Sequence, residues 1–196
     1  DEKGNRVPWS EIVRLPRHAR MTFERKVRGR LPQMPWWTLD VVARVDELLR
    51  PEWAAIEFGS GMSTRWLAER VSTLLSIEHD PEWFERIRPT LPPNVRYELR
   101  TYDGFPSLRG VADASVDFVV VDGLRRSDCV AEALPKLRHG GYLYLDNSDK
   151  DARSGDMRRA EQLVVEAAAA RGGELTYYTG FTIAMINAHQ GLLARL

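Results

Sequence analysis

The chain has 196 residues, with 28 basic and 28 acidic side chains, so its formal net charge is zero. Apolar residues make up 43% and charged residues 29%, which excludes a disordered, collagen-like or low-complexity protein. The single cysteine, Cys129, excludes an internal disulfide and cysteine-based zinc or iron–sulfur frameworks. Apolar runs are short and no signal peptide is recognisable, so we expect a cytoplasmic protein that spans no membrane.

Charge is unevenly distributed along the chain. Residues 1–30 hold nine basic and four acidic groups, whereas residues 31–196 hold 19 and 24. Residues 1–34 contain three prolines and have no clean apolar period, so only short helical pieces are expected there. We therefore divide the chain into a basic N-terminal arm, residues 1–37, which is a candidate lid, and one folded domain, residues 38–196.

Strands and helices alternate after the arm. A helix N-cap at Thr38 precedes an apolar stripe that Pro51 ends, and Asp80 followed by Pro81 is a strong helix start. Further helices are predicted at 63–71, from Asp128 to near Pro135, and at 157–171. Buried strands are predicted at 54–58, 74–78, 95–99, 116–121 and 142–145, followed by two tail strands at 174–179 and 181–187.

The short link at Gly180 makes the two tail strands antiparallel to each other, because no crossover fits between them. The preceding alternation predicts an α/β fold with a doubly wound, mostly parallel sheet and helices on both faces. In such a sheet, ligands bind at the carboxyl ends of the strands. Those ends are polar in this chain, and the residues concerned are Glu57, Glu78, Tyr102, Asp103, Asp122, Asp146 and Asn147.

A single polar residue at the end of a strand is expected wherever the strand reaches water. A carboxylate at five consecutive strand ends, however, predicts a binding site. After the first strand, Gly59 and Gly61 allow a tight turn and close approach of a ligand to the backbone. Thr64 stands where a dinucleotide fingerprint needs a third glycine, which disfavours nicotinamide and flavin binding. Glu78 is placed to accept hydrogen bonds from ribose hydroxyls.

The stretch Ile56-Glu57-Phe58-Gly59-Ser60-Gly61, together with Glu78, resembles the cofactor half of class I S-adenosylmethionine-dependent methyltransferases. The resemblance covers about residues 38–187 and implies a seven-stranded sheet whose last strand is antiparallel. It implies that the Gly59–Gly61 loop and Ser63 hold the methionine part, Glu78 the ribose, and His79, Tyr102 and Asp103 the adenine. Glu57 and Asp122 complete the expected cofactor-binding set.

The second half resembles catechol- and caffeoyl-coenzyme-A-type O-methyltransferases. In that group, residues matching Asp122, Asp146 and Asn147 bind a magnesium or calcium ion that holds two substrate oxygens. Such oxygen ligands suit a hard divalent cation, although Asp146-Asn147 is also an ordinary strand-end turn. The group's catalytic lysine is replaced by Arg125, followed by Arg126, and arginine stays protonated and cannot act as a base. The expected catalytic residues are therefore Asp122, Arg125 and His79.

Two features have competing interpretations. Trp36-Trp37 is by default a packing pair, and alternatively an aromatic wall over the acceptor. Cys129 is interpreted as a packing residue. The leading hypothesis is a methyltransferase that uses S-adenosyl-L-methionine, with or without a divalent metal such as Mg²⁺, on an oxygen of a small-molecule acceptor, in a chain that is a candidate homodimer. The alternatives are a protein that binds or modifies nucleic acid through its arm and a catalytically silent cofactor-binding domain.

Overall fold

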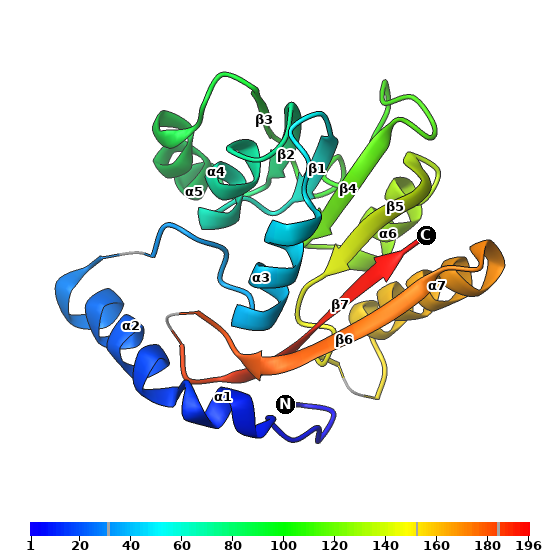
Figure 1. Cartoon of the computed structure of the whole chain (residues 1–196). Helices are drawn as coiled ribbons and strands as arrows, with labels where there is room; N and C mark the ends of the chain where they lie inside the picture. The colour runs from blue at the N-terminus through cyan, green and yellow to red at the C-terminus, as the bar shows by residue number, and fades with distance from the viewer. Residues whose placement is uncertain (31, 152, 184) are drawn as a thin grey trace.

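Within residues 1–30, 32–151, 153–183 and 185–196, which the computed structural model describes, a seven-stranded sheet has the order β3-β2-β1-β4-β5-β7-β6 (Figure 1). The strands are β1 (Ala54–Phe58), β2 (Thr73–Glu78), β3 (Val95–Leu99), β4 (Val116–Val121), β5 (Leu137–Leu145), β6 (Glu174–Phe181) and β7 (Ala188–Arg195). The helices are α1 (Trp9–Val13), α2 (Leu15–Arg28), α3 (Leu39–Leu48), α4 (Met62–Ala68), α5 (Pro81–Ile87), the 3₁₀ turn η1 (Arg88–Thr90), α6 (Arg126–Ala133) and α7 (Asp156–Arg171).

Strand direction confirms the predicted fold class. β1 to β5 pair in parallel, whereas β7 runs antiparallel to both of its neighbours, β5 and β6. The chain moves outward from β1 through β2 to β3 and then returns to β4 on the other side of β1. The order therefore reverses between β1 and β4, and their carboxyl ends form the crevice where ligands bind in open α/β sheets.

Both faces of the sheet are covered, and β4 shows how its sequence achieves this. All six of its residues are buried, because alternate side chains enter different cores. Phe118 and Val120 pack in a cluster with α3 and α4, whereas Val119 and Val121 pack in a cluster with α6 and α7. None of the helices in the described part of the chain is long and apolar enough to cross a membrane.

The end of the chain differs from the sequence prediction. The last strand was expected at 181–187, but β6 continues through Gly180 to Phe181 and β7 begins only at Ala188. Ile183, in the connecting loop, is instead buried in the core, and its amide donates to the carbonyl of Trp37. The apolar residues of β7 fill both cores, so tertiary packing decided the boundary. The predicted antiparallel pairing of the two strands is confirmed.

Other boundaries also differ from the prediction, and α4 ends at Ala68 rather than at residue 71. β5 begins at Leu137 rather than Tyr142, because its first residue pairs with Val116 before an irregularity that contains Gly140 and Gly141. α6 begins at Arg126, two residues before Asp128. Arg126 is thus the first residue of α6, whereas Arg125 precedes the helix in the left-handed conformation, with a φ of +47°.

The N-terminal arm folds into α1 and α2, which lie beside β6 (Figure 1). Its inner face is polar and buried: Glu11 is 1% exposed and His18 is fully enclosed. The Glu11 carboxylate accepts from the amide of Phe181 at 3.1 Å and from Arg14 at 2.8 Å. The His18 ring meets the Phe181 ring edge-on at 5.6 Å between centroids. These contacts attach the arm to the end of β6.

Candidate functional site

The glycine loop after β1 is the centre of the site. Gly59 has a φ of +89°, and a Cβ there would lie 2.7 Å from the carbonyl oxygen of Asp122. Gly59 is therefore required for the close packing of this loop on the end of β4. Gly61 is extended, and a Cβ there would meet only the Trp83 ring, at 3.9 Å. The loop is thus tightly packed at its first glycine and open at its second.

Glu57 lies beneath this loop and has no exposed surface. Its Oε1 accepts from Ser63 Oγ at 2.5 Å, and its Oε2 accepts from Thr64 Oγ1 at 2.6 Å and Ser76 Oγ at 2.7 Å. Burial raises the pKa of Glu57 from 4.5 to about 7, with the three hydroxyl donors opposing the rise. Glu57 and Ser63, two of the expected cofactor-binding residues, thus bond to each other and fix the loop from below.

Glu78 joins the end of β2 to the loop. Its Oε2 accepts from the amide and the hydroxyl of Ser60, at 3.0 and 2.7 Å, and its Oε1 accepts from the amides of His79 and Asp80, at 2.8 and 2.9 Å. A carboxylate offers about four acceptor positions, so these bonds occupy the group fully. The Ser60 hydroxyl also lies 2.6 Å from the Tyr97 hydroxyl, so a rotation toward Tyr97 would free one acceptor position on Glu78.

A cavity of about 230 Å³ adjoins the open side of the loop, and Trp36, Ser60, Gly61, Met62, Ser63, Trp83 and Asp122 line it. Trp83 is fixed because its indole N–H donates to the Ser60 carbonyl at 2.8 Å. The two adjacent tryptophans have different roles, one in the core and one at the cavity. Trp37 is 1% exposed and packs against Tyr144 and Trp66 in the core, whereas Trp36 forms an aromatic wall of the cavity.

His79, one of the residues expected near an adenine, contacts Glu78 and the loop that follows β3. His79 Nδ1 is 3.0 Å from Glu78 Oε1, and its ring meets the Phe105 ring edge-on.

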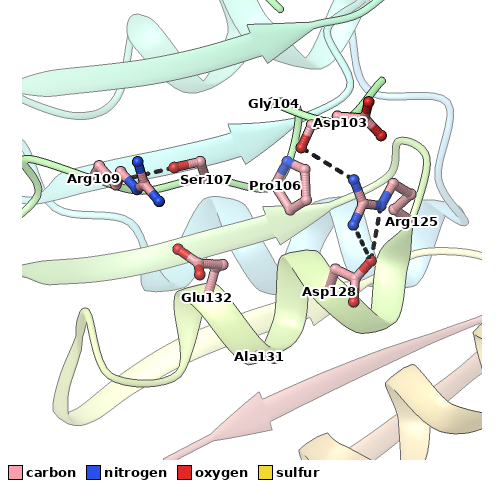
Figure 2. A pocket seen from close by; sticks show the side chains of 9 residues that line it. All are labelled: Asp103, Gly104, Pro106, Ser107, Arg109, Arg125, Asp128, Ala131 and Glu132. Carbon is pink, nitrogen blue, oxygen red and sulfur yellow. Dashed lines mark hydrogen bonds and ion pairs between the residues drawn. The ribbon is translucent and has the colours of Figure 1, made fainter. Parts of the chain in front are cut away.

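Arg125 does not reach the Asp122 cluster. Its guanidinium donates to the carbonyls of Tyr102 and Asp103, both at 3.1 Å, and pairs with Asp128 at 2.8 Å (Figure 2). Arg125 therefore fastens the loop after β3 to α6.

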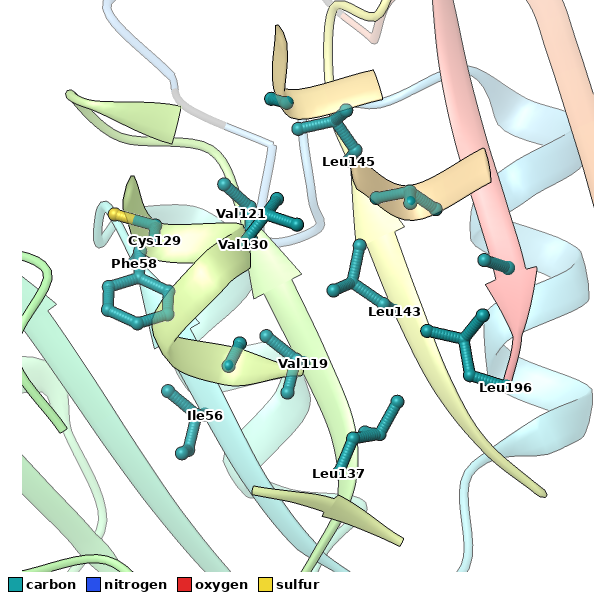
Figure 3. Close-up of a cluster of buried hydrophobic side chains, with 14 of the residues drawn as sticks. Ile56, Phe58, Val119, Val121, Cys129, Val130, Leu137, Leu143, Leu145 and Leu196 are labelled. Atoms are coloured by element: carbon teal, nitrogen blue, oxygen red, sulfur yellow. The ribbon is translucent and has the colours of Figure 1, made fainter. Parts of the chain in front are cut away.

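A hollow of about 550 Å³ lies beside Arg125, between that loop and α6 (Figure 2). Charged side chains of both signs, including Arg109, Glu132 and Asp128, line it. Cys129, in the same helix, has no access to either cavity, because its side chain is enclosed in the core beneath β4 (Figure 3). Burial raises the pKa of this thiol, in agreement with a packing role.

Two carboxylates meet where β4 and β5 end. Asp122 keeps 31% of its side chain exposed, whereas Asp146 is buried and accepts from the Tyr144 hydroxyl at 2.7 Å. Burial and the neighbouring Asp146 carboxylate raise the pKa of Asp122, and burial also raises the pKa of Asp146. Asn147 has a φ of +50°, a turn conformation that asparagine tolerates. Topology thus brings the predicted metal-ligating residues together.

The cation among these residues is the side chain of Arg126. Its Nη2 donates to Asp122 Oδ1 at 3.1 Å and Asn147 Oδ1 at 3.3 Å, its Nε donates to the Gly123 carbonyl at 3.0 Å, and its Nη1 donates to the Asp146 carbonyl. The donor set suits a divalent ion in chemistry, but a guanidinium already uses its oxygens. The residues therefore do not fit a bound metal in this arrangement. Among the described residues, no cluster of three His, Cys, Asp or Glu side chains offers another metal site.

Sequence reasoning missed three side chains of the site. Arg126 was passed over because alignment by spacing selects Arg125, and only the start of α6 decides which arginine turns inward. Trp83 and Tyr97 lie 20 or more residues from the loop they contact. Trp83 had a usable signal, because Asp80 caps α5 by accepting from the amides of Glu82 and Trp83, which begins that helix shortly after Glu78 and so keeps Trp83 near the end of β2.

Comparison with known proteins gives one family match. Residues 56–148, which include the loop and both acidic strand ends, match the model of a family described as a methyltransferase domain. A comparison with curated proteins finds no match.

Solved structures share the fold at low sequence identity. A candidate O-methyltransferase of Klebsiella pneumoniae has a TM-score of 0.64 and 17% identity, covering 92% of this chain and 90% of its own. The O-methyltransferase TomG of Streptomyces achromogenes, involved in tomaymycin synthesis and solved with S-adenosylmethionine, has a TM-score of 0.61 and 20% identity, covering 91% and 88%. The tRNA (m1A58) methyltransferase TrmI of Aquifex aeolicus has 0.57 and 15%, covering 89% and 72%.

Proposed function

We propose that this chain, a class I S-adenosylmethionine-dependent methyltransferase, transfers the methyl group to an oxygen of a small-molecule acceptor. The observation that carries the proposal is the cavity of about 230 Å³ in which the glycine loop, Trp36, Trp83 and Asp122 meet. A small cavity with aromatic walls and one carboxylate suits a compact, partly apolar acceptor. The cofactor supplies an electrophilic methyl group, and the chain's residues align it with the nucleophile, which can supply much of the rate.

The cofactor would lie along the loop, with its methionine part at Gly59–Gly61 and its ribose at Glu78. Gly61 supports this placement because the space beside it is open, and Glu78 supports it as a buried carboxylate at the end of β2. His79, Tyr102 and Asp103 would border the adenine. Isothermal titration with S-adenosylmethionine tests this: we expect binding by the natural chain and at least about a tenfold loss in Glu78→Ala. Equal binding by both proteins would overturn the placement.

Asp122 is proposed as the residue that accepts the acceptor's proton. It is a wall of the cavity and keeps part of its side chain exposed, whereas Arg125 is engaged elsewhere and His79 lies on the adenine side. Asp122→Asn keeps an oxygen for Arg126 but removes the base, so kcat should fall by about a hundredfold or more with cofactor affinity retained. A kcat within a few-fold of the natural enzyme would remove Asp122 from this role.

Metal assistance and a nucleic-acid acceptor are separate questions. The guanidinium of Arg126 among Asp122, Asn147 and the Asp146 carbonyl argues against a metal-assisted reaction, so we propose none. A phenolic or hydroxy-acid library and a short RNA, incubated with cofactor carrying a labelled methyl group, distinguish the acceptor classes. Label in the small molecules supports the proposal. Label in the RNA, lost at high salt, would assign the arm to nucleic-acid binding instead.

A further inference from the structure

We infer that Arg126 is a built-in cation that takes the place of a divalent metal in this site, so that the site binds no metal ion. The inference refines the proposed function by naming what balances the charge at the acceptor end. It starts from three oxygens that resemble a metal-ligand set, Asp122 Oδ1, Asn147 Oδ1 and the Asp146 carbonyl, which all accept hydrogen bonds from one guanidinium.

The guanidinium is largely buried, and each of its nitrogens donates a hydrogen bond. Only 11% of the Arg126 side chain is exposed, and its Nε, Nη1 and Nη2 atoms all donate to the turns that end β4 and β5. A divalent ion held by the predicted ligands would need the Asp122 and Asn147 oxygens that already accept from Arg126, so the two cations exclude each other. Arginine remains charged at any physiological pH, and its planar group can serve several acceptors at once. The side chain therefore neutralises and orients these residues permanently.

The position of Arg126 is fixed by a second carboxylate at the start of α7. Asp156 Oδ2 accepts from the Arg126 amide at 2.6 Å, and Asp156 Oδ1 accepts from the amide and hydroxyl of Ser127, at 3.1 and 2.5 Å. These bonds hold the first turn of α6 against α7. The guanidinium is thus positioned by backbone contacts, in contrast to the neighbouring Arg125, which points to the loop after β3.

A resident guanidinium changes which acceptors the site selects. A metal ion with open coordination positions can hold two neighbouring oxygens of one substrate, whereas Arg126 has no comparable open positions. The acceptor class that follows has a single reacting oxygen and is held by the cavity walls and the adjacent charge. A second neighbouring oxygen, as in a vicinal diol or catechol, should not strengthen binding. Arg126 acts through Asp122 and Asn147, and so it is a positioning residue.

Metal binding tests the inference without cofactor or acceptor. Mn²⁺ is titrated into the natural chain and into Arg126→Ala, with free Mn²⁺ followed by electron paramagnetic resonance. We expect no specific binding by the natural chain and, in Arg126→Ala, a new site at least about tenfold tighter than any residual binding. The new site should disappear in Arg126→Ala/Asp122→Asn, which removes the carboxylate that Arg126 contacts. Arg125→Ala is the matched control, because it removes the same charge one residue away and should gain no site.

Two results would overturn the inference. One is Mn²⁺ binding by the natural chain that Asp122→Asn abolishes, and the other is the failure of folded Arg126→Ala to gain a site. If the alanine variant does not fold, Arg126→Gln removes the charge while keeping a polar side chain, and the same criterion applies to it. Because the titration contains no S-adenosylmethionine, its failure is distinct from failure of the proposed methyl transfer, which cofactor titration tests.

Discussion

Gly59 and Gly61 differ at the scale of single residues, although they look alike in the sequence. Gly59 combines a positive φ with a close approach to the Asp122 carbonyl, whereas Gly61 is extended beside open space. Gly59→Ala should lower the free energy of unfolding by about 2–5 kcal/mol, because strain and overpacking act together. Gly61→Ala should change it by less than about 1 kcal/mol, yet weaken cofactor binding.

Chemical denaturation of both variants, with cofactor titration of Gly61→Ala, checks this pair. Equal destabilisation by the two substitutions would show that the loop packs differently from the arrangement described. Unchanged cofactor affinity in Gly61→Ala would place the cofactor away from the second glycine.

Glu57 predicts a pH dependence. Its pKa rises from 4.5 to about 7 on folding, so between these values the folded state holds a proton that the unfolded state has lost. Stability relative to Glu57→Gln should therefore fall as pH rises through this window, by about 3 kcal/mol in total. Denaturation of both proteins from about pH 5 to about pH 8 measures this difference in unfolding free energy. If the folded protein holds no proton on Glu57, the difference will stay constant or rise with pH.

At the same scale, the sequence indicates which residues lie at the strand ends, but it does not indicate where neighbouring side chains point. Motif spacing identified Glu78, Asp122 and Asp146 as neighbours of one crevice, because parallel strands place their carboxyl ends at one edge. Spacing could not choose between Arg125 and Arg126. The difference depends on the backbone at the start of α6, because Arg125 is left-handed, with a φ of +47°, whereas Arg126 is the first helical residue and its side chain reaches Asp122.

At the scale of elements, the docking of α1 and α2 depends on one carboxylate. Glu11→Ala removes the acceptor for the Phe181 amide and leaves that amide unpaired, whereas Arg14 keeps its second carboxylate partner, Asp40. We expect the arm to detach with a loss of about 1–3 kcal/mol. Limited trypsin digestion should then cut within α2 much faster than in the natural chain. Glu24→Ala, which removes a more exposed pair with Arg28, is the control and should leave cleavage unchanged.

Strands were predictable where one apolar run is clearly bounded by turn residues. The sequence ranges of β1, β3 and β4 agree with the structure, because apolar runs bounded by turn residues have few alternatives. The position of β7 was not predictable in this way. Both Phe181–Ile183 and Leu192–Ala194 are apolar enough for a strand, and only the space beside β5 selects the second run.

At the scale of the whole molecule, order should decrease outward from the middle of the sheet. β4 has both faces buried between the two cores, and part of its core with α6 is shown in Figure 3. Amide hydrogen exchange should therefore be slowest in Val116–Val121 and fastest in the arm helices, whose surfaces are largely exposed. Mass spectrometry of exchanged peptides measures this order, and rapid exchange in β4 would contradict the packing of helices on both faces of the sheet.

The attachment of α1 to the end of β6 has a consequence for synthesis. A ribosome releases residues 1–30 long before Phe181, so the surface that receives Glu11 and His18 does not exist while most of the chain is being made. Those two side chains stay hydrated until the tail hairpin has formed beside β5. Residues 1–30 are therefore translated well before the strand that they pack against, and they reach their final positions only after that strand has formed.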